Sequence, residues 1–130
     1  MSDQEQNIEF VKRGYEAFNA GDGNAVMDLF DDNIEWVQPG DSAIGGSYRG
    51  KQDLAALLAK MAEKQTHADP QRFIADGDDV IALCQTTAGG ETSEMAQVFT
   101  LRGGKVVAAH AYADTAALER IFGKKEVATA

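Results

Sequence analysis

Cysteine, histidine and basic charge are all scarce in this chain, and each shortage excludes a class of protein. The single cysteine, Cys84, rules out an internal disulfide among the 130 residues. The two histidines, His67 and His110, have no partner at metal-ligand spacing, which disfavours a metal centre. Only 12 Lys and Arg stand against 21 Asp and Glu, so the net charge is −9. Such a charge repels phosphate backbones and anionic lipids, and nucleic-acid and membrane partners are therefore disfavoured.

Motifs for nucleotide binding and covalent catalysis are also missing. The glycine-rich stretch GDSAIGGSYRGK, residues 40–51, matches neither GxxxxGK[ST] nor GxGxxG, and there is no GxSxG motif. Cys84 lies in an apolar stretch and is most simply a small buried hydrophobe. The start of the chain, MSDQEQNIEF, lacks the basic and apolar regions of a secretory signal. We therefore expect no cofactor and a reducing, cytoplasmic setting.

What the sequence does contain is an ordinary globular composition. Hydrophobic residues make up 44% and charged residues 25%, enough apolar surface for a substantial core. Its length fits one domain over residues 1–130.

The first half of the sequence has helical periodicity. Apolar residues at helical spacing predict a helix over residues 4–20, ended by NAGDG, and a short one over 24–30. Leu54, Leu57, Leu58 and Met61 follow the i, i+3, i+4, i+7 pattern, which predicts a long amphipathic helix over 51–64. Between these helices we expect a strand over 34–38 and a loop over 39–50.

The second half changes to the periodicity of strands. Segments 72–75, 80–87, 92–102 and 105–113 are separated by DGDD, GG and GG, which predicts consecutive antiparallel hairpins. Helices followed by a meander predict an α+β fold, in which three N-terminal helices cover the concave face of a curved antiparallel or mixed sheet.

Successive residues of a strand point to opposite faces of the sheet, so counting from the two diglycine turns predicts which side chains share a face. The turn at 103–104 pairs Gln97 with His110 and Met95 with Tyr112, and it places Gln97, Phe99, His110 and Tyr112 on one inner wall. The small side chains would then form an outer face that either joins a second copy by a two-fold contact or packs beneath a loop. That predicted dimer face comprises Ala96, Val98, Thr100, Val107, Ala109 and Ala111.

The candidate site centres on Asp114 and His110, and each has two interpretations. Asp114 in DTAAL is a good helix N-cap, or else a pocket carboxylate whose pKa is raised by desolvation for acid–base work. His110 is either a hydrogen-bonded core residue or the proton-transfer partner of Asp114, with Gln97 fixing its tautomer. The expected walls and orienting groups, some of them equally explicable as core, are Tyr15, Trp36, Gln38, Tyr48, Met95, Phe99 and Tyr112.

Five segments in this order resemble the nuclear transport factor 2-like superfamily, in particular its SnoaL-like and ketosteroid-isomerase-like members. They are YEAFNAGD (15–22), LFDDNIEWVQPG (29–40), GGSYRGKQDLAALL (45–58), FTLRGGKVVAAHAY (99–112) and DTAAL with Gly123. The resemblance implies a cone in which helices fold over a strongly bent sheet, a pocket opens between them, and dimers often form through the outer sheet face.

The resemblance implies several activities. A ketosteroid isomerase would carry a tyrosine and two aspartates where this chain has Gly14, Val37 or Gln38, and Gln97. This catalytic set of a tyrosine and two aspartates is missing, unless Asp41 or Tyr15 takes one of these roles from a neighbouring position in the sequence.

SnoaL-like cyclases resemble the chain better, because Asp114, His110 and Gln97 match their Asp, His and Gln. The implied activity is cofactor-free acid–base catalysis on an apolar carbonyl or polycyclic compound, by an isomerase or cyclase or by a hydrolase or lyase. The alternatives are a binding module for a small apolar ligand and a protein-assembly domain.

Overall fold

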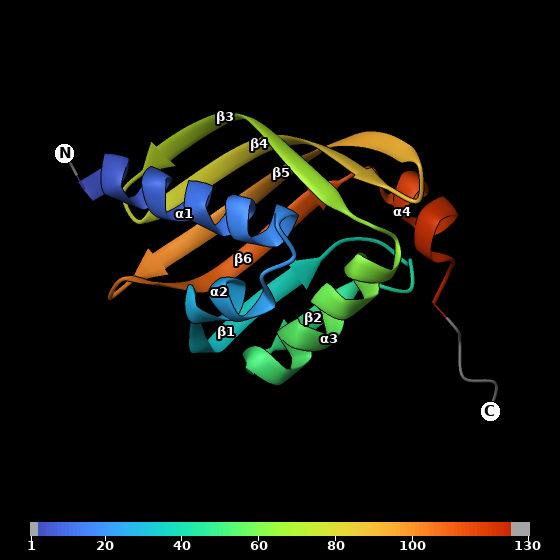
Figure 1. The fold of residues 1–130 in the computed structure, drawn as a ribbon, viewed down its shortest axis with the longest axis horizontal. Helices are drawn as coiled ribbons and strands as arrows, with labels where there is room; N and C mark the ends of the chain where they lie inside the picture. The colour runs from blue at the N-terminus through green and yellow to red at the C-terminus, as the bar shows by residue number, and fades with distance from the viewer. Residues whose placement is uncertain (1–2, 126–130) are drawn as a thin grey trace.

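A computed structural model describes residues 3–125 and shows one mixed six-stranded sheet with helices packed on its concave side (Figure 1). The strand order is β2-β1-β6-β5-β4-β3, and only the β1–β6 pair is parallel among the described strands. The strands are β1 Phe30–Gln38, β2 Gly46–Arg49, β3 His67–Asp76, β4 Asp79–Ala88, β5 Glu91–Arg102 and β6 Lys105–Ala113. The helices are α1 Asp3–Asn19, α2 Gly23–Asp28, α3 Gly50–Glu63 and α4 Thr115–Phe122. The predicted α+β class is confirmed, with α4 as a fourth, C-terminal helix.

The helices form where the apolar spacing predicts them. Val11 and Tyr15 are the buried residues of α1, and Leu54 and Leu57 of α3 are fully buried. The N-cap of α2 is Asp22, whose carboxylate accepts a hydrogen bond from the Ala25 amide at 3.1 Å. Helix α1 lies over β3 and β4, and α3 lies over β1 and β2, so the two long helices cover the two opposite edges of the sheet (Figure 1).

Two segments differ from the prediction. Residues 39–50, expected to be a loop, contain β2, which pairs with β1 through backbone hydrogen bonds despite its flanking glycines. Strand β3 is longer than expected and includes Pro70. Pro70 is tolerated there because β3 is an edge strand and the ladder is irregular between Pro70 and Arg72.

The register of the β4–β5 hairpin is as predicted. Gly89 and Gly90 have φ of 56° and 79°, the left-handed conformation that a two-residue hairpin turn requires. Cys84 accordingly lies opposite Met95, Ala82 opposite Gln97 and Val80 opposite Phe99.

The register of the β5–β6 hairpin is not as predicted beyond the turn. Leu101 pairs with Val106 as expected, but Thr100 pairs with Ala108, so Val107 is an extra residue on β6. This β-bulge moves every later residue of β6 to the opposite face.

The predicted pairs Gln97–His110 and Met95–Tyr112 are therefore wrong. Gln97 pairs with Ala111 and Met95 with Ala113, while His110 lies opposite Val98. Ala109 and Ala111 are buried on the concave side, not on the outer face where they were expected. His110 and Tyr112 instead point outward and are exposed.

The core contains a cluster of five aromatic rings between helix and sheet, those of Tyr15, Phe30, Trp36, Phe73 and Phe99. The Tyr15 and Phe99 ring centroids lie 5.8 Å apart and those of Trp36 and Phe99 6.4 Å apart, both edge to face. Phe30 adds a tilted contact with Trp36 at 6.0 Å. Ala109 neighbours Trp36 across the β1–β6 ladder, so a small side chain leaves room for the indole.

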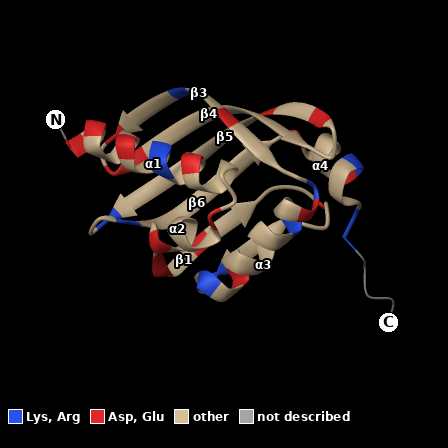
Figure 2. Ribbon diagram, viewed as in Figure 1, with Lys and Arg blue, Asp and Glu red and all other residues tan. Residues whose placement is uncertain are grey.

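Charged residues lie mainly on the helices, strand ends and loops, whereas the middles of β4, β5 and β6 carry none (Figure 2). Within residues 3–125, no helix combines the length and apolar character needed to cross a bilayer.

Candidate functional site: an apolar pocket under the helices

A cavity of about 110 Å³ lies between the concave face of the sheet and helices α1, α3 and α4; we refer to it as the pocket. Its helical wall is apolar and includes Phe10 and Phe18 of α1 with Leu58 and Met61 of α3. A buried water needs only about 10–15 Å³, so the pocket is large enough for a small organic molecule.

Six of the residues expected at the site do line the pocket. They are Tyr15, Trp36, Gln38, Met95, Gln97 and Phe99. Strands β1 and β5 supply five of them, and Tyr15 reaches the same space from α1. These side chains meet in the pocket because the β4–β5 register and the buried apolar face of α1 are both as the sequence predicts.

The other four lie outside it. His110 and Tyr112 stack on one another on the outer face of the sheet, with ring centroids 4.5 Å apart and planes 15° apart. The Tyr48 hydroxyl donates a 2.6 Å hydrogen bond to the Ile44 carbonyl. Asp114 is the N-cap of α4, where its carboxylate accepts a 3.0 Å hydrogen bond from the Ala117 amide.

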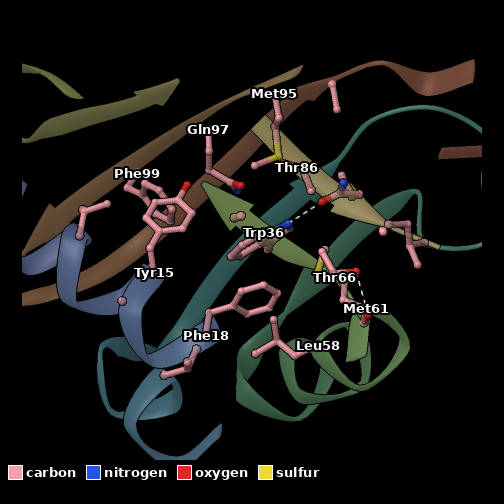
Figure 3. Close-up of a pocket in the computed structure, with 18 of the residues that line it drawn as sticks. Tyr15, Phe18, Trp36, Leu58, Met61, Thr66, Thr86, Met95, Gln97 and Phe99 are labelled. Carbon is pink, nitrogen blue, oxygen red and sulfur yellow. Dashed lines mark hydrogen bonds between the residues drawn. The ribbon is translucent and has the colours of Figure 1, made fainter. Parts of the chain in front are cut away.

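Three polar atoms of the pocket are buried without a hydrogen-bond partner among the described residues. They are the Tyr15 hydroxyl, the Gln97 Nε2 and the Thr86 hydroxyl. Figure 3 shows Tyr15 and Gln97 near Phe99 and Thr86 farther along, beyond Trp36, with Phe18, Leu58 and Met61 on the opposite side of the pocket. A buried polar group without a partner costs about 1–3 kcal/mol, so three in one cavity are a costly arrangement for packing alone.

Tyr15 is the one ionisable side chain of the described chain that lines the pocket. Burial raises the pKa of its hydroxyl well above the ordinary value, and the neighbouring thiol of Cys84 raises it further. Burial likewise raises the pKa of Cys84. Both groups are therefore protonated at neutral pH, and the Tyr15 hydroxyl is a hydrogen-bond donor.

Sequence reasoning missed two contributions to the pocket. Thr86 lies opposite Ser93 in the β4–β5 ladder and on the same face as Cys84. The register set by the diglycine turn would therefore have been enough to predict its position. Helix α4 contributes Leu118, Ile121 and Phe122, and their i, i+3, i+4 spacing indicates an apolar face. The capping sequence predicted the start of this helix but not its position over the pocket.

Residues 3–125 hold no cluster of three or more side chains that could ligate a metal ion.

Comparisons with known proteins agree with the fold. Residues 11–109 match the model of the SnoaL-like domain. Bal32a, from a soil-derived mobile gene cassette, is 30% identical, with 93% of this chain and 99% of that chain covered and a TM-score of 0.87. An NTF2-like protein from Burkholderia xenovorans LB400 is 31% identical, with 92% and 97% covered and a TM-score of 0.74.

TerC, co-crystallized with polyporic acid, is 23% identical, with 89% of this chain and 97% of that chain covered and a TM-score of 0.79, which shows a shared fold. No curated protein matches the sequence. Since the domain model spans well over half of the residues, the chain belongs to the SnoaL-like domain family.

Proposed function

We propose that the protein binds a small, mostly apolar molecule with a hydrogen-bond-accepting oxygen in the pocket. The observation that carries this proposal is the set of buried groups of Tyr15, Thr86 and Gln97 without a hydrogen-bond partner in an otherwise apolar cavity. A ligand oxygen beside Tyr15 and Gln97 could accept hydrogen bonds from them, while the apolar part of the ligand would contact the aromatic and aliphatic walls.

The pocket favours binding over acid–base catalysis. A general acid or base works best with a pKa near the operating pH, and Tyr15 is shifted away from that range. His110 lies on the opposite side of the sheet, and the carboxylate of Asp114 already accepts the cap hydrogen bond of α4. The co-crystal of TerC with polyporic acid adds support for ligand binding by this fold.

Replacing Tyr15 with phenylalanine tests the proposal, with acetophenone as the probe ligand. Tyr15→Phe should weaken acetophenone binding about two- to tenfold, since a neutral hydrogen bond contributes about 0.5–1.5 kcal/mol. The ligand-free variant should stay within about 1 kcal/mol of the wild type, because the polar group beside the lost hydroxyl is the weakly accepting thiol of Cys84. Titration calorimetry measures the affinity and thermal unfolding the stability.

Asp114→Asn is the matched control, because asparagine also caps helices well. It should bind acetophenone like the wild type. Equal affinity of Tyr15→Phe and wild type would contradict the proposal, and so would a loss confined to Asp114→Asn, which would place the ligand at the N-terminus of α4.

We further propose that two copies associate through the outer face of the sheet. A row that contains no Asp, Glu, Lys or Arg crosses five strands there, and its members are Val37, His110, Val98, Ile81 and Ile74. The stacked rings of His110 and Tyr112 extend it, and Tyr112 is 56% exposed in the single chain. In a chain of net charge −9, such a row is well suited to a two-fold contact with its own copy.

Val98→Asp should convert the dimer to a monomer, because two carboxylates would be buried near the centre of the contact. Sedimentation equilibrium measures the mass. Ala55→Asp, which adds the same charge on an exposed position of α3, should leave the dimer intact. A wild-type protein that is monomeric at all accessible concentrations would exclude this association.

A further inference from the structure

Gln38 is held in one orientation at the edge of the pocket. It lies at the end of β1 and is 4% exposed. Its Oε1 accepts a 2.9 Å hydrogen bond from the indole Nε1 of Trp36, drawn as a dashed line from Trp36 in Figure 3. Both residues point to the concave side because they alternate along the same strand, and both line the pocket.

This hydrogen bond leaves the donor end of the amide free. Among the described residues, the Gln38 Nε2 has no protein partner. An indole can only donate, so turning the amide around would break the bond and bring two N–H donors face to face. The hydroxyls of Tyr15 and Thr86 can rotate to suit a ligand, and no protein hydrogen bond fixes the Gln97 amide. Gln38 is thus the hydrogen-bond donor of the pocket whose orientation is fixed, since the Thr66 hydroxyl already donates to the Met61 carbonyl.

We propose that Gln38 determines specificity by donating to a carbonyl oxygen, and that Trp36 is the positioning residue that holds it as a donor. This inference rests on the proposed binding function and narrows the ligand to neutral carbonyl compounds. A carboxylate would be desolvated without a cation in the lining, and an ammonium group without an anion. The volume of about 110 Å³ is of the same order as an engineered cavity of about 150 Å³ that holds benzene, so we expect a single ring.

Two probes of nearly equal shape isolate the carbonyl. Acetophenone and α-methylstyrene differ only in an oxygen replaced by a methylene group, so the ratio of their dissociation constants reports hydrogen bonding and not size. Water hydrates the ketone better than the alkene, so the informative quantity is the change in this ratio between wild type and variant. Gln38→Leu should lower the relative preference for acetophenone about two- to tenfold, the value of one neutral hydrogen bond.

Trp36→Phe should lower the preference by a similar factor with Gln38 still present, because the freed amide can turn its oxygen toward the ligand. A purely structural role of Trp36 would change both affinities together and leave their ratio unaltered. The double variant should show the same ratio as Gln38→Leu alone, since the two residues act through one group.

The unmodified protein offers a second measurement in case a variant does not fold. In ¹⁵N-labelled wild type, the Gln38 side-chain amide resonances should shift with acetophenone and remain in place with α-methylstyrene. A wild type that binds neither probe would overturn the proposed function together with this inference. Binding with a ratio of dissociation constants unchanged in both variants, or with no distinction between the probes at the Gln38 resonances, would overturn this inference alone.

Discussion

Gly45→Ala is expected to lower the free energy of unfolding by about 3 kcal/mol or more. A Cβ atom at this position would lie 2.2 Å from the carbonyl oxygen of Gly40 and 3.3 Å from that of Ser42. Both are backbone atoms, so no side-chain rotation can relieve the overlap. The segment also carries Ile44, which is 1% exposed and lines the pocket. Urea unfolding followed by tryptophan fluorescence measures the change.

Gly23→Ala is the matched control for this substitution. No atom lies within 4 Å of a Cβ built on Gly23, and its φ is not in the left-handed region. We expect its stability to stay within about 0.5 kcal/mol of the wild type or to rise slightly. Similar stabilities of the two variants would show that the segment around Gly45 can move aside.

Leu54→Ala should have an effect of similar size for a different reason. Leu54 is fully buried in α3, and removing its side chain leaves a cavity in the core. Substitutions of this kind cost about 2.7–5 kcal/mol, depending on how far the surroundings relax. Thermal or urea unfolding with the same probe tests the prediction.

Leu58→Ala makes the same chemical change one turn further along α3. Leu58 is only half-buried and already borders the pocket, so its removal should destabilise less and should enlarge the ligand space. Tighter binding of a larger ring ketone by Leu58→Ala would be a direct sign of that enlargement. Equal destabilisation by the two variants would contradict the difference in burial.

Helices and the β4–β5 hairpin could be predicted because their signals are local. The spacing of Leu54 and Leu57 determines which face of α3 is buried, and the turn at Gly89 sets the register of β4 against β5. Tyr15, Gln97 and Phe99 were placed on the concave side for these reasons. Strand β2 was not predicted because its four residues are held mainly by pairing with β1, and such pairing produces no local pattern in the sequence.

The position of His110 could not be predicted because it depends on the bulge at Val107. The run Lys105–Ala113 alternates smoothly and contains no glycine or other residue typical of a bulge. The expectation that larger side chains of β6 face inward also failed. On the concave side the large rings of Trp36 and Phe99 lie beside the methyl group of Ala109, so β6 contributes small residues there.

The bulge also has a consequence for comparing relatives of different length. Val106 already faces Leu101 and Ala108 already faces Thr100, so Val107 is the residue that the ladder does not need. A relative lacking that one position would keep the same alanines beneath its helices. Aligning the two sequences without a gap there would assign pocket positions to the wrong side chains all along the final strand.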